Sequence, residues 1–288
     1  MVVNSPRLPS PGETILGGHF LMNGGGKGAN QAVAAVRLGG NVTLIAKTGD
    51  DIFGRQAIDA FRAEGIDTRY MATDQDNPSG IALITVDDKG ENTIVVAAGA
   101  NAALVPADLI HAKGILQGAV VVLVQLEIPL ETVEWLAKIR EESNGILILN
   151  PAPARQLSET LLQRISIITP NETEATILTG IQVQDKVTAT RAAKKLREKG
   201  IKKIIITMGA EGALLLDKDE PEFIQAPKVK AVDTTAAGDV FNGALALGIA
   251  EGLSLAEAVR FGCQAASLSV TRRGAQTSAP FRHEIALK

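Results

Sequence analysis

Residues 232–244 read Val-Asp-Thr-Thr-Ala-Ala-Gly-Asp-Val-Phe-Asn-Gly-Ala, and this stretch decides what we expect of the chain. Three small residues, Ala236, Ala237 and Gly238, precede Asp239 at the start of an apolar helical pattern. Small residues let backbone N–H groups approach a ligand closely, and the first N–H groups of a helix have no intrahelical acceptor. The pattern therefore predicts an anion-binding helix start with an acid at its edge, as phosphoryl transfer to a hydroxyl requires.

The same stretch also has a purely structural interpretation. Aspartate is common near helix starts, because its carboxylate caps free N–H groups and complements the helix dipole. Residues 232–244 alone do not decide between the two interpretations, so other motifs must.

The composition is that of an ordinary globular protein. The chain has 288 residues, 45% hydrophobic and 21% charged, which allows one large α/β domain with a small appendage. The net charge is −3 and no basic run stands out, so we expect neither a nucleic acid nor a membrane as partner. The single cysteine, Cys263, suits a reducing cytoplasm, where we expect the protein, and we assign it to core packing.

Strand and helix patterns alternate from residue 28 onward. Helical patterns cover 28–38, 53–64, 130–142, 156–164, 187–199, 238–251 and 254–270, and strand patterns cover 42–47, 120–125, 146–150, 165–169 and 203–207. Near-continuous apolar strands between helices are typical of a parallel sheet covered on both faces. Together with an antiparallel addition at 212–217, they predict a three-layer α/β domain with a mostly parallel central sheet.

Two segments break this alternation. Residues 79–86 and 91–97 have the pattern of short strands and flank Asp87-Asp88-Lys89-Gly90, a hairpin signal, while residues 1–22 are extended and turn-rich. We expect them to form a small β-sheet that acts as a lid over a site at the carboxyl ends of the parallel strands. The expected division is 23–75 with 100–288 for the main domain and 1–22 with 76–99 for the lid.

A glycine-rich loop, Asn23-Gly-Gly-Gly-Lys-Gly-Ala-Asn-Gln31, leads into the first helix. Consecutive glycines are expected where a positive φ or close approach to a ligand is needed. The loop is not a Walker A motif, because Gly28 stands where serine or threonine is required. Asn23, Lys27 and Asn30 suit a polyhydroxylated ligand, although a plain helix-entry turn has the same local pattern.

Two glutamates, Glu174 and Glu127, follow the ends of predicted strands. Asn171 and Glu174 would share one face of a helix and order Mg²⁺ through water near phosphates. The alternative, which these residues alone favour, is a capping arrangement in which Asn171 bonds the first turn and Glu174 reaches back. Glu127 either accepts sugar hydroxyls or is a surface carboxylate.

Four motifs in this order resemble the PfkB-type carbohydrate kinases, most closely those that act on ribose. They are Gly25-Gly-Lys-Gly-Ala-Asn-Gln31, Asn150-Pro-Ala-Pro-Ala154, Thr169-Pro-Asn-Glu-Thr-Glu174 and Asp233-Thr-Thr-Ala-Ala-Gly-Asp239. The resemblance extends from about Pro6 to Phe281. It implies the three-layer fold with a lid, and ATP-dependent phosphorylation of D-ribose at its 5-hydroxyl.

The resemblance also implies roles for individual residues. Asp239 is the implied base, and Ala236, Ala237 and Gly238 form the implied anion hole. The implied sugar-binding residues are Gly26, Lys27, Asn30, Glu127 and Asp239. The implied residues near ATP and Mg²⁺ are Asn171, Glu174, Thr207, Gly209 and Gly238. The implied loop for a monovalent cation, usually K⁺, contains Asp233, Thr235, Ser269, Arg272, Gly274 and Ser278. We also expect a homodimer through the lid, and a lowered pKa for Asp239 because it sits at a positive helix end.

The chain departs from the family pattern at its start. Family members open with a strand and a Gly-Ser-x-Asn-x-Asp turn before the segment that matches Met1–Ser5. We therefore expect the natural product to begin upstream, and the shorter form to expose apolar surface and bind sugar weakly. Two alternatives stay open: a related kinase for deoxyribose, a nucleoside or a hexose, and a non-catalytic ligand-binding protein.

Overall fold

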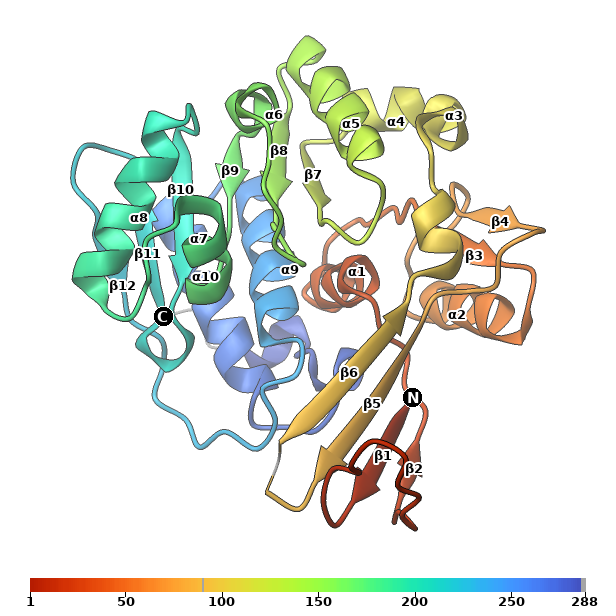
Figure 1. The fold of residues 1–288 in the computed structure, drawn as a ribbon. Helices are drawn as coiled ribbons and strands as arrows, with labels where there is room; N and C mark the ends of the chain where they lie inside the picture. Colours follow the sequence, from red (N-terminus) through yellow and green to blue (C-terminus); the bar gives the residue numbers. More distant parts are fainter. Residues whose placement is uncertain (90, 286–288) are drawn as a thin grey trace.

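The computed structural model describes residues 1–89 and 91–285, and a six-stranded sheet lies at the centre of the main body (Figure 1). The sheet order is β12-β11-β10-β9-β8-β7. The strands are β7 (Val121–Val124), β8 (Ile146–Leu149), β9 (Ile167–Ile168), β10 (Lys203–Thr207), β11 (Ala213–Leu216) and β12 (Glu222–Ile224). Strands β7 to β10 run parallel, whereas β11 and β12 pair antiparallel. The mostly parallel sheet and its antiparallel addition are confirmed.

Helices cover both faces of this sheet, because its strands are apolar on both sides. Leu147 and Leu149 pack into one buried cluster, whereas Ile148 packs into another on the opposite face. The helices are α1 (Lys27–Arg37), α2 (Ile52–Ala63), α3 (Pro106–Leu109), α4 (Lys113–Gly118), α5 (Leu130–Glu142), α6 (Glu159–Arg164), α7 (Glu172–Thr179), α8 (Lys186–Glu198), α9 (Ala237–Ala250) and α10 (Leu255–Ser269). Residues of α5 and α8 join the first cluster, and residues of α9 and α10 join the second. Within the described residues, no helix is long and apolar enough to span a membrane.

One predicted strand is misplaced. Residues 42–47 were expected as a strand, but the structure has only a bridge between Thr43 and Asp67 there, followed by β3 (Lys47–Gly49). Strand β3 pairs in parallel with β4 (Ala72–Asp74), so the strand begins later than the apolar pattern of residues 42–47 suggests. Strand β7 is one edge of the six-stranded sheet, and its first three residues are half-buried.

A second sheet, of order β2-β1-β5-β6, stands away from the main body (Figure 1). It contains β1 (Val2–Ser5), β2 (Phe20–Leu21), β5 (Ile81–Asp87) and β6 (Asn92–Ala97). Strands β5 and β6 pair antiparallel as predicted, whereas Gly90 of the predicted turn lies outside the described residues. Strand β1 pairs parallel with β5. Residues far apart in sequence therefore form this sheet, which we call the small sheet.

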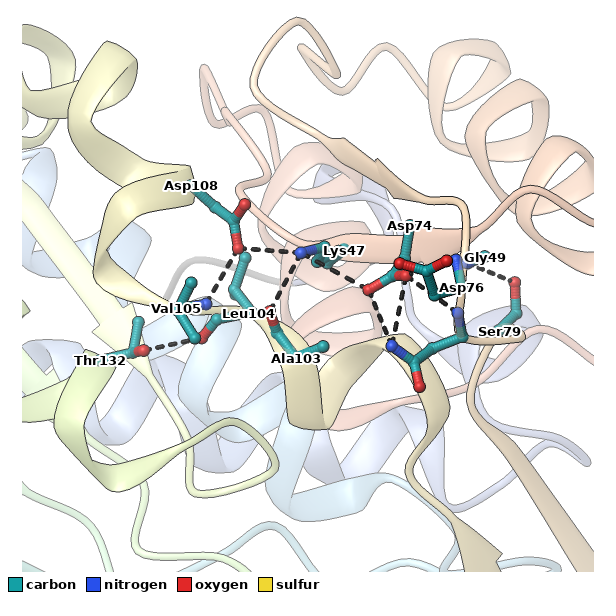
Figure 2. Close-up of polar contacts among 11 residues, drawn as sticks. Lys47, Gly49, Asp74, Asp76, Ser79, Ala103, Leu104, Val105, Asp108 and Thr132 are labelled. Atoms are coloured by element: carbon teal, nitrogen blue, oxygen red, sulfur yellow. Dashed lines mark hydrogen bonds and ion pairs between the residues drawn. The ribbon is translucent and has the colours of Figure 1, made fainter.

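Charged side chains anchor the base of the small sheet to the main body, as Figure 2 shows. Lys47 on β3 lies 3.5 Å from Asp74 and 3.1 Å from Asp108, and its ammonium also donates to the carbonyl of Ala103. Burial opposes the charge of Lys47, but the two carboxylates outweigh it and raise its pKa. The contacts join β3 to the chain on both sides of the β5–β6 hairpin.

A second anchor lies at the point where the chain leaves for β5. The carboxylate of Asp51 accepts from the backbone N–H of Ser79 at 2.7 Å and from its hydroxyl at 2.8 Å. The same carboxylate caps α2 by accepting from Gly54. The base of the small sheet is thus fixed to the start of a helix.

We expect Lys47→Met to loosen this base. The substitution keeps the length of the side chain but leaves two carboxylates without their cation, so the free energy of unfolding should fall by about 1–3 kcal/mol. Hydrogen exchange should also increase in β5 and β6 more than in β8 and β10. Arg55→Met is the control, because Arg55 forms an exposed ion pair with Asp50, and it should change stability by less than about 0.5 kcal/mol. Equal effects of the two substitutions would contradict the anchoring role.

Candidate active site

A cavity of about 180 Å³ opens at the carboxyl ends of the parallel strands, beside the start of α9. Eight of the predicted site residues line it: Lys27, Asn171, Glu174, Thr207, Ala236, Ala237, Gly238 and Asp239. Five further lining residues were not predicted: Asn150, Ala152, Thr169, Thr234 and Asn242. The cavity therefore brings together segments from the whole length of the chain.

The start of α9 is open toward the cavity. Ala236 adopts a left-handed conformation with φ of 60°, and no side chain caps the helix at this residue. A Cβ added to Gly238 would meet no atom within 4 Å, so there is free space at the first turn. The first N–H groups of a helix have no intrahelical acceptor, and an open start of this kind suits an anion.

Asp239 does not act as a cap for its own helix in the observed contacts. Its Oδ2 accepts from Asn30 Nδ2 at 2.8 Å, and its Oδ1 accepts from Gln31 Nε2 at 3.0 Å. The residue is buried, with 6% of its surface exposed. These contacts favour the functional interpretation of residues 232–244 over simple capping.

The expected lowering of the Asp239 pKa is wrong. Burial raises the pKa of this carboxyl, and the opposing effects of Asn30, Lys27 and Gln31 do not cancel it. The helix end stabilises the charged form of Asp239, but the loss of hydration on burial destabilises that form by a larger amount. The sequence showed the helix start and not the depth of burial.

The glycine-rich loop delivers polar groups to the same place. Gly26 has φ of 91° and precedes α1, whose first residue, Lys27, donates its backbone N–H to Glu127 Oε2 at 2.8 Å. Glu127 is therefore tied to the loop and is not a free surface carboxylate. Gly26, Asn30 and Glu127 are outside the cavity lining, and Asn30 Oδ1 is buried with no hydrogen-bond partner among the described residues.

Asn171 and Glu174 form the capping arrangement that their spacing favoured. Asn171 Oδ1 accepts from the backbone of Glu174 at 2.8 Å, and Glu174 Oε2 accepts from the backbone of Asn171 at 2.9 Å. The Glu174 carboxyl also lines the cavity, and burial raises its pKa against the opposing effect of Lys27. Thr207 lies beside Asn171 in a parallel bridge, whereas Gly209 is outside the described cavity lining.

Asp233 joins two segments next to the cavity. Its Oδ1 accepts from the backbone of Thr235 at 2.9 Å and its Oδ2 from the backbone of Gly274 at 2.8 Å. Burial opposes the charge, but these hydrogen bonds outweigh it and hold the pKa of Asp233 below its usual value. The hydrogen bond to Gly274 places the loop at 233–235 next to the segment at 269–278.

The two serines of the predicted cation loop bond locally, whereas its arginine reaches a glutamate outside the loop. The hydroxyls of Ser269 and Ser278 donate to backbone carbonyls three residues earlier, and Arg272 pairs with Glu284. No cluster of three or more His, Cys, Asp or Glu side chains suited to a metal occurs in the described residues. The carboxylate and hydroxyl oxygens of this loop keep lone pairs that take no part in these hydrogen bonds.

The family of the chain follows from comparison with known proteins. Residues 1–282 match the pfkB family of carbohydrate kinases, and the chain belongs to this family. It is 45% identical to the ribokinase of Haemophilus influenzae over 98% of this chain and 92% of that protein. It is 37% identical to the deoxyribokinase of Salmonella typhi over 97% of this chain and 92% of that protein.

A solved structure confirms the fold. The structure of Arabidopsis thaliana ribokinase complexed with ribose and ATP is 32% identical and matches with a TM-score of 0.93, covering 99% of this chain and 93% of that chain. The expected α/β fold of the family is thereby confirmed.

We expect Asp239 to titrate at an unusually high pH for an aspartate. Burial should place its pKa above the ordinary value of 3.8, whereas Asp74, whose carboxylate accepts N–H groups from Asn77 and Asp76, should titrate at about 2. Carbon NMR of the side-chain carboxyls measures both groups in one sample, and Asp239→Asn assigns the signal. A pKa of Asp239 at or below 3.8 would show that burial does not dominate at this site.

Proposed function

We propose that the chain is an ATP-dependent sugar kinase that converts D-ribose and ATP to D-ribose 5-phosphate and ADP. The observation that carries the proposal is a buried carboxylate, Asp239, at an open helix start, beside Asn30 Oδ1, which has no partner in the part of the chain that the structure describes. Membership of the carbohydrate kinase family and the similarity to ribokinases support it.

The geometry supplies what phosphoryl transfer needs. Asp239 accepts the proton of the attacking hydroxyl, and the backbone N–H groups of Ala236 and Gly238 stabilise charge on the transferred phosphoryl group, whereas the N–H of Ala237 donates to the Thr234 carbonyl at 3.2 Å. Lys27 and Asn30 hold the sugar next to the carboxylate, and Glu127 holds the loop that carries Lys27. A loose transition state makes the hydroxyl proton acidic late, so positioning and charge stabilisation provide most of the rate.

The cavity fits a hydrated Mg²⁺ that accompanies ATP. Glu174 Oε2 is engaged by the backbone of Asn171, which leaves Glu174 Oε1 to hold a water ligand of the ion. Bound Mg²⁺ would neutralise charge on the phosphates. Thr207 and Asn171 line the same side of the cavity, and we assign the nucleotide phosphates to that side.

The Asp233 loop fits a monovalent cation such as K⁺. The Asp233 carboxylate cross-links its two halves, and the carboxylate, hydroxyl and backbone carbonyl oxygens of the loop all keep lone pairs for a cation. The loop directly precedes the start of α9, and an ordered cation there would fix the anion hole. Activation by K⁺ is therefore part of the proposal.

Release of ADP from MgATP tests the proposal directly. We expect turnover that requires D-ribose and increases when K⁺ replaces tetramethylammonium. Deoxyribose belongs in the same assay, because the chain also resembles a deoxyribokinase. A higher kcat/KM for deoxyribose would reassign the substrate, and binding of ribose and ATP without turnover would make the chain a binding protein.

The substitution Asp239→Asn should lower kcat at least ~10²-fold, the lower end for removal of a general base. Asparagine has nearly the same shape but cannot take the proton. Asp185→Asn is the control, because Asp185 caps α8 far from the cavity lining and should leave kcat unchanged. A rate for Asp239→Asn within a few-fold of the parent enzyme would overturn the assignment of the base.

We also propose that two copies of the chain pair through the small sheet, which would then act as the lid. Strand β6 is a sheet edge, and Ile94, Val95 and Val96 on it are more than half exposed. Leu83, directly opposite Val95, is 51% exposed on the same face. Exposed apolar residues on an unpaired edge strand are typical of an interaction surface.

Val95→Glu should therefore convert a dimer to a monomer in sedimentation experiments. The substitution places a charge on the apolar face that the second copy would cover. Val187→Glu on α8 is the matched control, because Val187 is equally exposed (68% against 66%) but lies outside the small sheet. A monomeric parent chain, or a dimer that survives Val95→Glu, would refute this mode of pairing.

A further inference from the structure

A network of polar side chains, which we call the amide belt, connects the carboxyl ends of three parallel strands to Asp239. Gln125 follows β7, Asn150 follows β8 and Thr169 follows β9, so the three lie at the carboxyl ends of neighbouring parallel strands. Gln31 on α1 connects to the first two and to Asp239. Only 2% of the Gln31 surface is exposed.

The hydrogen bonds of Gln31 fix the orientation of its amide. Nε2 donates to Asp239 Oδ1 at 3.0 Å and to Asn150 Oδ1 at 3.1 Å, which uses both protons of the NH₂ group. Oε1 accepts from Gln125 Nε2. A flipped amide would place Oε1 against two acceptors and the NH₂ group against a donor, so only one orientation is compatible with these neighbours.

The belt is itself anchored at its far end. Asn150 Nδ2 donates to the carbonyl of Thr169 at 3.3 Å, and the hydroxyl of Thr169 donates to Asn242 Oδ1 at 2.6 Å. Asn242 Nδ2 in turn donates to the carbonyl of Gly238 in the first turn of α9. The chain of hydrogen bonds therefore leads from Asp239 through the sheet edge and back to the helix that carries Asp239.

We infer that Gln31 is a positioning residue for the proposed reaction: it fixes the Asp239 carboxylate from the side opposite Asn30, with Gln125 and Asn150 fixing Gln31. This inference rests on the proposed kinase function. A carboxylate held by donors on both oxygens cannot rotate, and a misplaced catalytic group loses much of the rate advantage of positioning. Because Gln31 contacts the base through a buried hydrogen bond, its effect should appear in kcat more than in KM.

The charged groups that act on Asp239 are Lys27 on α1 and Glu174 on α7. Neither is altered by substitution of Gln31. Removal of a donor to the ionised carboxylate raises its pKa, because the charged form loses stabilisation. A hydrogen bond to a charged group contributes enough to move a pKa by about one unit.

The test is Gln31→Met, which preserves the volume and removes both hydrogen-bonding groups. We expect kcat to fall about 10- to 100-fold, with KM for ribose and ATP within about twofold of the parent values. The acidic limb of the kcat–pH profile should move up by about one unit. Thr132→Val is the control, because it removes a buried hydrogen bond, from Thr132 Oγ1 to the Leu104 carbonyl, far from Asp239. It should lower stability without moving the limb.

A second variant decides the case if Gln31→Met does not fold. Gln125 is partly exposed and contacts Gln31, so Gln125→Met should move the limb in the same direction by a smaller amount. An unchanged limb and kcat in the folded variant would overturn the inference. A parent chain without kinase activity would instead contradict the proposed function. Titration of the Asp239 carboxyl in both variants then tests the hydrogen bond from Gln31 alone. An unshifted pKa of Asp239 would overturn the positioning role of Gln31.

Discussion

The architecture of the site depends on one buried contact, between the Asp239 carboxylate on α9 and the adjacent amides of Asn30 and Gln31 on α1. A buried carboxylate without partners would destabilise the fold, so α1 must cross α9 closely enough for short amide side chains to reach it. Gly243 makes this possible: a Cβ there would lie 2.5 Å from the Gln31 carbonyl. The glycine four residues after Asp239 is thus as necessary to the motif as the small residues before it.

The sequence predicted the parts of the fold that depend on local pattern. The apolar runs at 146–150 and 203–207 are parallel strands, and the two runs that flank the predicted turn form an antiparallel pair, because period and turn chemistry are local properties. The strand expected at 42–47 begins later, since its register depends on β4, a partner that local pattern does not specify. The raised pKa of Asp239 and the amide belt were missed for a related reason. Burial and contacts between residues 31, 125, 150 and 239 arise only when the elements pack. The only signal for the belt was the recurrence of a polar residue after each of three strands.

Asn171 and Glu174 show that a structural and a functional interpretation need not exclude each other. Their reciprocal hydrogen bonds satisfy the orphan N–H groups at the start of α7, which is what a capping box does. The same bonds fix the Glu174 side chain at the cavity with one oxygen still available. The Glu174 side chain therefore caps α7 and lines the cavity at the same time, and the capping hydrogen bond holds its carboxylate in place.

The charge balance of the cavity argues for the ions that the proposed reaction requires. Among the described lining residues, Asp239 and Glu174 are acidic and Lys27 alone is basic, so the side chains by themselves disfavour binding of a nucleoside triphosphate. Burial is the main cause of the raised pKa of Glu174, and the negative charge of Asp239 raises it further by a smaller amount. The open start of α9 offers partial positive charge, but a helix end contributes only about half a unit charge. A cation that accompanies the nucleotide would weaken the repulsion between a polyanion and these two carboxylates, and Glu174, which has one oxygen outside the capping bond, is the carboxylate to which we assign the hydrated ion.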